Sequence, residues 1–264
     1  MKQEMLRVGF IGYGTIGQAV ARIVAEQAFD GITLVGALVR HPTLAHLSEG
    51  VKIVDTLAAL LELQPDVIVE AAGHNGLQEH GATILRMGID LILISVGALA
   101  DPLFFQVLLK AAQSGNAQMK VASGAIGALD ALSSASYGRL TRVIHTLRKP
   151  PSALLRSEEA AQLTTSREIF RGNARQAVQQ FPEFLNVAAA VALAGKGFDE
   201  TEVCVLADPA IGHSVHEILA EGEFGIFRFE IENTPNSVPA RGAKLVAMSI
   251  VHALLLRRGF FLLG

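Results

Sequence analysis

Short hydrophobic runs alternate with segments of helical periodicity through the first half of the chain. Residues 6–11 form such a run, and apolar residues then recur at helical spacing through residues 15–28. The pattern predicts further strands at 32–39, 67–69, 91–94 and 119–122, and helices at 56–62, 78–87 and from Asp101-Pro102 to about residue 115, with Asp55 capping the helix 56–62. Because strands and helices alternate in this way, we expect an α/β domain of the Rossmann type, with a doubly wound parallel sheet.

The second half of the chain has a different hydrophobic pattern. Residues 227–231 alternate apolar and charged side chains with period two, which indicates a strand with one solvated face in an antiparallel or mixed sheet. Further strands are predicted at 142–147, 202–206 and 215–219, and helices at 174–180 and 186–194. These elements predict a second domain of the α+β class.

The last predicted helix covers residues 243–256 and follows an irregular segment, 233–242, that contains two prolines. It is followed by two arginines and a glycine, the usual arrangement of basic charge and cap at a helix C-terminus. We expect this helix to pack back on the first domain. The predicted domains are therefore residues 1–122 with residues 243–264, and residues 123–242.

Composition and charge narrow the class of protein. The chain has 264 residues, half of them hydrophobic, and a formal net charge of −3 without any dense Lys/Arg cluster, so we expect no nucleic-acid or membrane-surface partner. Apolar stretches such as 187–194 are far shorter than the roughly 18 residues of a membrane span, and no signal-peptide pattern opens the sequence. We therefore expect a cytoplasmic protein with a small-molecule partner. The single cysteine, Cys204, predicts neither a disulfide nor a zinc site.

A glycine-rich turn follows the first predicted strand and opens the first predicted helix: Gly12, Tyr13, Gly14, Thr15, Ile16 and Gly17. In a GxGxxG turn the first glycine allows the tight bend, the second lets the backbone approach a pyrophosphate, and the third lets helix and strand pack closely. The motif alone is weak, but its place between strand and helix makes it specific. We therefore predict that this turn binds a dinucleotide, NAD or NADP.

The end of the second predicted strand bears on the choice between these cofactors. NAD-selective domains usually carry an acidic residue there, whereas this chain reads Leu38-Val39-Arg40. Arg40 can pair with a 2′-phosphate, which predicts that NADP is accepted at least as well as NAD. The alternative is that Arg40 is an ordinary solvated surface arginine.

Several later segments resemble the L-aspartate dehydrogenase family, and together they cover nearly the whole chain in order. They are AAGHNGLQEH (71–80), SVGAL (95–99), SGAIGALDAL (123–132), Arg148-Lys149-Pro150, Phe181-Pro182, Asn186-Val187-Ala188-Ala189 and ADPAIGHSVHEI (207–218). The resemblance implies a two-domain, usually homodimeric enzyme whose second domain carries substrate and dimer contacts. Such enzymes interconvert L-aspartate and iminoaspartate with NAD(P). Iminoaspartate then hydrolyses to oxaloacetate and ammonia, or feeds NAD biosynthesis.

The resemblance also assigns site residues. The family's catalytic histidine corresponds to His216, and its two cofactor contacts outside the glycine turn correspond to Ala125 and Asn186. An imidazole that titrates near neutrality suits the proton transfers of amine oxidation. Without the resemblance, a lone histidine beside apolar residues is more often structural. His213 lies three residues before His216, but no acidic or cysteine partner stands at a metal-ligand distance, so we predict no metal site.

Two segments depart from the family's pattern. Phe184 stands where the family usually has asparagine, and the usual Asn-Pro-Lys-Thr reads Val238-Pro239-Ala240-Arg241. A dicarboxylate needs cationic or N–H partners at both ends, and Lys149, or Arg241 one residue beyond the usual lysine, is expected to compensate for the missing polar groups. These departures leave open a substrate larger or less acidic than aspartate. Two other readings stay open: a related NAD(P)-dependent imine or semialdehyde reductase, and a dinucleotide-binding paralogue without catalysis.

Overall fold

The computed structural model describes residues 5–27, 29, 31–41, 50–233 and 243–258. Contacts between Cα atoms divide the chain into two compact units, residues 1–124 with 243–264, and residues 125–242. The first unit is therefore built from two separate stretches of sequence, with the second unit inserted between them.

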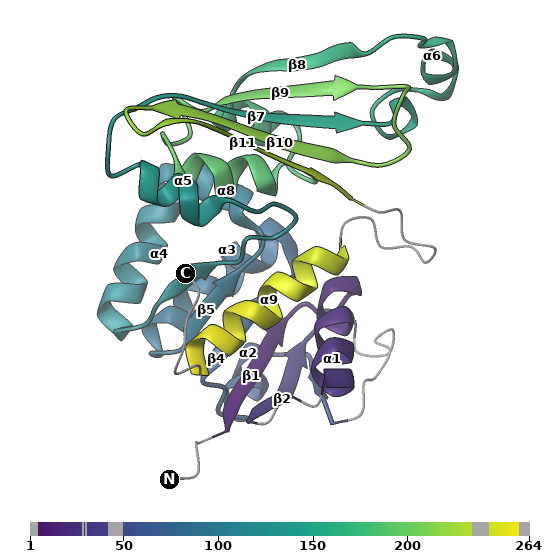
Figure 1. Cartoon of the computed structure of the whole chain (residues 1–264). Helices are drawn as coiled ribbons and strands as arrows, with labels where there is room; N and C mark the ends of the chain where they lie inside the picture. Colours follow the sequence, from purple (N-terminus) through teal and green to yellow (C-terminus); the bar gives the residue numbers. More distant parts are fainter. Residues whose placement is uncertain (1–4, 28, 30, 42–49, 234–242, 259–264) are drawn as a thin grey trace. The chain divides into compact units, whose positions relative to one another are not determined.

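The first unit contains a six-stranded parallel sheet in the order β3-β2-β1-β4-β5-β6. The strands are β1 (Leu6–Ile11), β2 (Ile32–Leu38), β3 (Lys52–Val54), β4 (Val67–Glu70), β5 (Asp90–Leu93) and β6 (Met119–Val121). The helices are α1 (Thr15–Gln27), α2 (Leu57–Leu61), α3 (Gly73–Arg86), the 3-10 helix η2 (Val96–Ala100), α4 (Pro102–Gly115) and α9 (Ala243–Arg258). This arrangement confirms the predicted Rossmann-type fold (Figure 1).

The central strands explain why the hydrophobic runs were visible in the sequence. All four residues of β4 are buried, and Val8 and Phe10 of β1 are completely inaccessible to solvent. Strands covered on both faces by helices read as continuous apolar runs rather than as alternating ones. Helix α9 packs against α1, and Ser249 Oγ accepts a hydrogen bond of 3.1 Å from the backbone N–H of Gly124.

Two local predictions need correction. Thr56 rather than Asp55 caps α2, because its hydroxyl accepts the backbone N–H of Ala59 at 3.3 Å. Helix α3 begins at Gly73, five residues before the predicted start, with Gly73 in a left-handed conformation at φ 82°. In addition, the sequence pattern did not predict β3 (Lys52–Val54), a short edge strand.

The second unit contains a five-stranded mixed sheet in the order β11-β10-β7-β9-β8, where β7 and β9 are parallel and the other neighbours antiparallel. Its strands are β7 (Leu140–Lys149), β8 (Arg167–Asn173), β9 (Glu202–Ala207), β10 (Val215–Gly222) and β11 (Gly225–Glu232). Its helices are α5 (Leu129–Ala135), the 3-10 helix η3 (Pro151–Ala153), α6 (Ser157–Gln162), α7 (Ala174–Gln180) and α8 (Asn186–Ala194). The mixed sheet was predicted, whereas β8, α5 and α6 were not.

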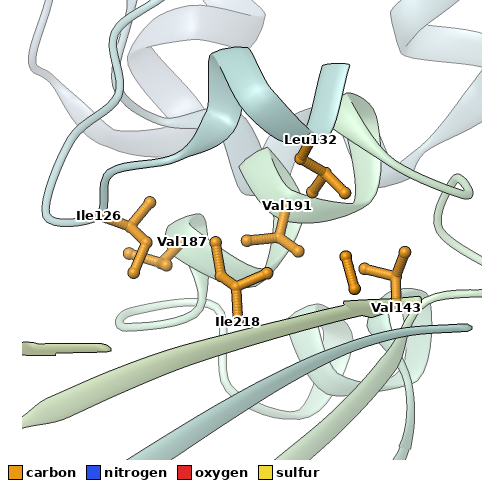
Figure 2. Close-up of a cluster of buried hydrophobic side chains, with 7 residues drawn as sticks. Ile126, Leu132, Val143, Val187, Val191 and Ile218 are labelled. Carbon is orange, nitrogen blue, oxygen red and sulfur yellow. The ribbon is translucent and has the colours of Figure 1, made fainter. Parts of the chain in front are cut away.

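One face of this second sheet carries the core of the unit. Side chains of β7 and β10 meet α5 and α8 in a cluster of buried residues, drawn in Figure 2: Ile126, Leu132, Val143, Val187, Val191, Ile218 and Ala220. Phe227, Phe229 and Ile231 of β11 pack against the cluster. The alternation along β11 therefore reflects this burial, with its apolar residues on the covered face.

No helix in the described part of the chain has the length and apolarity needed to cross a membrane.

Candidate functional site

The turn between β1 and α1 requires glycine at its first position. Gly12 adopts φ 81°, and its backbone N–H donates a 2.9 Å hydrogen bond to the carbonyl of Leu38 at the end of β2. A Cβ atom added to Gly12 would lie 2.5 Å from the carbonyl oxygen of Ala71. Backbone conformation and lack of space thus both exclude a side chain here.

The other two glycines of the turn meet two different demands. A Cβ atom on Gly14 would meet nothing within 4 Å, so the exposed backbone at this position is open to a ligand. A Cβ atom on Gly17 would lie 3.0 Å from the Tyr13 ring and 3.2 Å from the carbonyl oxygen of Gly12, so helix and turn pack tightly there. Open backbone at the second glycine and close packing at the third are what pyrophosphate binding needs, and the turn therefore fits a dinucleotide.

The remaining turn residues lead into helix α1. Helix α1 begins at Thr15, and its N-terminal N–H groups favour a bound phosphate. The Tyr13 ring packs edge-on against Phe10, with ring centroids 5.6 Å apart, and the residue is only 3% exposed. Ile16 is half-buried. Tyr13 can therefore offer a ligand its main chain but not its ring.

Arg40 lies two residues beyond the end of β2 and is exposed. In this fold the end of the second strand is where the adenosine ribose is recognised. The assignment of Arg40 to the 2′-phosphate of NADP stays a prediction.

A buried carboxylate at the end of β4 was not predicted. Glu70 has no solvent exposure, and its two oxygens accept the backbone N–H groups of Ala72 at 2.9 Å and Ser95 at 3.0 Å. Burial raises the pKa of Glu70 above 4.5, while these hydrogen bonds oppose the shift. Because ligands bind beyond the carboxyl ends of parallel strands, Glu70 orders the loops on which a cofactor site depends.

In the second unit, His216 lies on the helix-covered face of β10. It is 6% exposed, and its Nδ1 atom lies 3.1 Å from Nε2 of His145 on β7, which is completely buried. The two rings are nearly parallel, with 22° between their planes. His145 was missed in the sequence, although a polar residue among the inward positions of a predicted strand is a usable signal.

The surroundings of this histidine pair favour neutral rings. Burial and the positive charge of Lys149 lower the pKa of His216 from 6.5 to about 4. Burial, together with His216, lowers the pKa of His145 well below 6.5. Both rings are therefore uncharged at neutral pH.

Lys149 ends β7 on the same face of the sheet as His145. Its Nζ atom lies 4.3 Å from the centre of the Phe184 ring, an arrangement typical of a cation–π contact. The phenylalanine that departs from the family's pattern therefore contacts the lysine expected to bind substrate. A lysine ammonium whose charge acts on the buried His216 can also attract a carboxylate.

The other predicted site residues have simpler positions. Asn186 is the first residue of α8 and is half-buried, and Ala125 is half-buried beside the cluster shown in Figure 2. Arg241, together with Val238 and Ala240, lies outside the described residues. Among the residues that the structure describes, no group of three or more His, Cys, Asp or Glu side chains is arranged to hold a metal ion.

Two family models match the chain. The model described as "Homoserine dehydrogenase, NAD binding domain" matches residues 12–122, and the one described as "Aspartate dehydrogenase, C-terminal" matches residues 130–257. The first match begins at the glycine turn and the second includes both buried histidines. The turn thus belongs to an NAD-binding domain, as its geometry indicates.

Curated relatives match over almost their whole length. The L-aspartate dehydrogenase of Ruegeria pomeroyi is 42% identical over 258 residues, with 95% of this chain and 92% of the relative covered. That of Pseudomonas aeruginosa is 36% identical, with 95% and 97% covered. Identity at this level over both domains goes well beyond a shared dinucleotide fold.

Solved structures extend the comparison. The crystal structure of aspartate dehydrogenase from Thermotoga maritima matches with a TM-score of 0.80 and 28% sequence identity, and the match covers 99% of this chain and 100% of the Thermotoga chain. A hyperthermophilic archaeal homoserine dehydrogenase in complex with NADPH shares the fold at a TM-score of 0.63 and 12% identity. From the coverage, the identity and the matched models, we conclude that this chain is an oxidoreductase of the L-aspartate dehydrogenase family.

Proposed function

We propose that the protein oxidises L-aspartate to iminoaspartate with NAD(P). The observation that carries this proposal is the buried, neutral imidazole of His216 within electrostatic reach of the Lys149 ammonium. An uncharged base beside a fixed cation suits a substrate that must lose a proton and carries two carboxylates.

The reaction removes a hydride from Cα and a proton from the nitrogen of the neutral amine, which leaves a C=N bond. NAD(P), when bound, supplies the hydride acceptor. Water then adds to the imine carbon, and loss of ammonia gives oxaloacetate. The protein has to bind two carboxylates and take up and return protons.

His216 is the proposed proton acceptor. At neutral pH its ring carries no charge, so one nitrogen has a lone pair available for the proton released from the substrate nitrogen. A pKa near 4 makes a weak base. Binding of a substrate carboxylate beside Lys149 offsets the ammonium charge that lowers this pKa, so we expect substrate to strengthen the base.

Lys149 is the proposed partner of one substrate carboxylate, with Arg241 as the partner of the other. The Phe184 ring holds the lysine ammonium 4.3 Å from its centre and limits where that charge can lie. Because a lysine side chain is long and flexible, a contact of its ammonium group with an aromatic ring favours one side-chain conformation over the others.

On the cofactor side, we assign the pyrophosphate to the glycine turn and further contacts to Ala125 and Asn186. The Asn186 amide can hold the nicotinamide carboxamide without adding a charge. Arg40 supports the use of NADP beside NAD. We further propose that residues 123–242 form the substrate and dimerisation domain.

The broader setting is also proposed. We infer a homodimer, since a closed two-fold arrangement is the commonest one. The lone cysteine and the NAD(P) requirement fit a reducing compartment, the cytoplasm. Supply of iminoaspartate for NAD biosynthesis is the proposed role there.

Steady-state kinetics tests the proposal. L-Aspartate, L-glutamate, L-asparagine and L-alanine are compared with NAD and with NADP, and oxaloacetate with ammonia in the reductive direction. We expect the highest kcat/KM for L-aspartate, and a kcat lowered about 100-fold or more in His216→Ala. A higher kcat/KM for a larger or uncharged amino acid, or His216→Ala with unchanged kcat, overturns the corresponding part of the proposal.

A further inference from the structure

We propose that His145 is a positioning residue for His216: it engages Nδ1 of the His216 ring and so leaves Nε2 as the nitrogen that exchanges a proton with the substrate. The inference rests on the proposed role of His216 in aspartate oxidation. It concerns a residue on a different strand, whose action passes through His216 alone.

The pairing of β7 and β10 brings the two rings together. In this antiparallel pair His216 lies opposite Leu147, and His145 lies opposite Ile218, so the two histidines are diagonal neighbours on the covered face of the sheet. Diagonal neighbours are close enough for aromatic side chains to touch. Their nitrogens lie 3.1 Å apart, within hydrogen-bonding distance.

The position of His145 in the core makes this contact informative. The residue has no solvent exposure, and Val143, two residues before it, belongs to the buried cluster of Figure 2. Among the described residues its Nδ1 atom has no hydrogen-bond partner. Within the described residues, the contact with His216 is therefore the one polar interaction of this ring, so the position of the His145 ring is coupled to that of His216.

The imidazole of His145 suits a contact with a ring that gains and then loses a proton. Either Nε2 of His145 donates to Nδ1 of His216, or it accepts the Nδ1 proton, depending on which neutral tautomer each ring adopts. Nε2 of His216 can take up a proton only when Nδ1 carries the ring proton, so the productive arrangement is the second one, in which Nδ1–H donates to Nε2 of His145 before and after the transfer. A lysine could not accept this hydrogen bond, and a carboxylate would place a charge in the core.

Two substitutions of His145 separate this role from simple packing. His145→Leu introduces an apolar side chain of similar size that cannot form a hydrogen bond. The amide of His145→Gln, in contrast, can donate or accept one. We expect His145→Leu to lower kcat about 10-fold or more with KM for L-aspartate changed by less than about threefold, and His145→Gln to restore most of the loss.

Stability should change little while activity falls. His145→Leu removes a buried ring nitrogen that has no partner but leaves Nδ1 of His216 without one, and these two effects on the free energy of unfolding oppose each other, so we expect the Tm at pH 7.5 to stay within about 3 °C of that of the unmodified protein. A lower Tm that accompanies the lower kcat, without rescue by glutamine, indicates a purely structural role and overturns the proposal.

A double-mutant cycle tests whether His145 acts through His216. In the His216→Ala background, His145→Leu should lower kcat no further, because the ring that it positions is absent. If His216→Ala abolishes turnover and His145→Leu alone leaves kcat unchanged, the inference about His145 fails while the proposed function stands. If His216→Ala leaves kcat unchanged, the proposed role of His216 itself fails.

Nitrogen-15 NMR of histidine-labelled protein supplies a readout independent of turnover. The ring-nitrogen shifts of His216 distinguish a hydrogen-bonded Nδ1 from one that lacks a partner. We expect the Nδ1 shift to move in His145→Leu and to return toward its original value in His145→Gln. His213, which contacts Glu232 at 3.3 Å, is the matched control, since His213→Gln should change neither this shift nor kcat. An unchanged Nδ1 shift in His145→Leu contradicts the proposal.

Discussion

Ser95 donates two hydrogen bonds to Glu70, one from its backbone N–H to Oε2 at 3.0 Å and one from its hydroxyl to Oε1 at 2.9 Å. Oε1 also accepts the backbone N–H of Ala72 at 2.9 Å. Each carboxylate oxygen thus faces a backbone donor, and the side chain joins the loops that follow β4 and β5.

This arrangement predicts that Glu70→Gln destabilises the protein. Whichever way the amide is turned, its NH2 group faces a backbone N–H, so one buried donor loses its acceptor. We expect the free energy of unfolding to fall by about 1–3 kcal/mol, measured by urea denaturation at pH 7.5. Glu79→Gln, on an exposed side chain of α3, serves as the control and should leave the stability unchanged. Equal stability of the Glu70 variant would show that one of the two oxygens is not an acceptor.

The glycines of the turn should separate stability from cofactor binding. Gly14→Ala places a methyl group in open space, so we expect unfolding free energy to change by less than about 1 kcal/mol while the Kd for NADH rises about 10-fold or more. Gly12→Ala meets the Ala71 carbonyl at a positive φ, and we expect it to cost about 2 kcal/mol or more.

Thermal unfolding and titration of NADH fluorescence check this pair. The two variants are compared at one protein concentration, with and without NADH. Undiminished NADH binding by a folded Gly14→Ala protein contradicts the assignment of the turn.

Stability should also depend on pH through His216. In the unfolded chain this histidine takes up a proton near pH 6.5, but in the folded chain only near pH 4. The unfolded state therefore binds more protons between these values, and stability is lost as pH falls from 6.5 to 4. One such group contributes about 3 kcal/mol over this window, at roughly 1.4 kcal/mol per pH unit.

Urea unfolding between pH 7.5 and 4.5 measures the effect of this titration. The groups that act on His216 are Lys149, whose charge lowers its pKa, and His145, whose own lowered pKa contributes a loss of the same sign. We expect His216→Gln to show a shallower loss of stability than the unmodified protein. An identical pH dependence would place the titration elsewhere in the molecule.

Arg40 should discriminate between the two cofactors. Removing its guanidinium in Arg40→Ala takes away a partner for the 2′-phosphate, so we expect the Kd for NADPH to rise about 10-fold and that for NADH to stay within about twofold. Isothermal titration calorimetry with both cofactors gives the comparison. Arg86→Ala, in the last turn of α3, is the control. A parallel change for NADH and NADPH would assign Arg40 to a phosphate common to both.

The parts of the molecule that could be predicted from sequence depend on nearby residues. The β1–turn–α1 unit is encoded by glycine spacing and local periodicity, and its geometry matches those rules. Strand β8, in contrast, lies at the edge of its sheet and has only intermediate and exposed residues, so its hydrophobic pattern is faint.

The missed functional residues depend on distant parts of the chain. The role of Glu70 depends on its hydrogen bonds with Ser95, 25 residues later in the chain. The role of His145 depends on its contact with His216, 71 residues later. Such pairs are created by strand order and register, which local patterns do not specify. His216 itself was assigned through family resemblance rather than through its surroundings.

The division of the first unit into two stretches of sequence has a consequence for biosynthesis. Helix α9, which packs against α1, follows the whole second unit in the chain. The ribosome therefore synthesises every residue of the inserted unit before it synthesises α9, the helix that completes the nucleotide-binding unit. During translation the inserted unit can therefore fold first, and the surface of α1 that contacts α9 stays exposed until α9 has been synthesised.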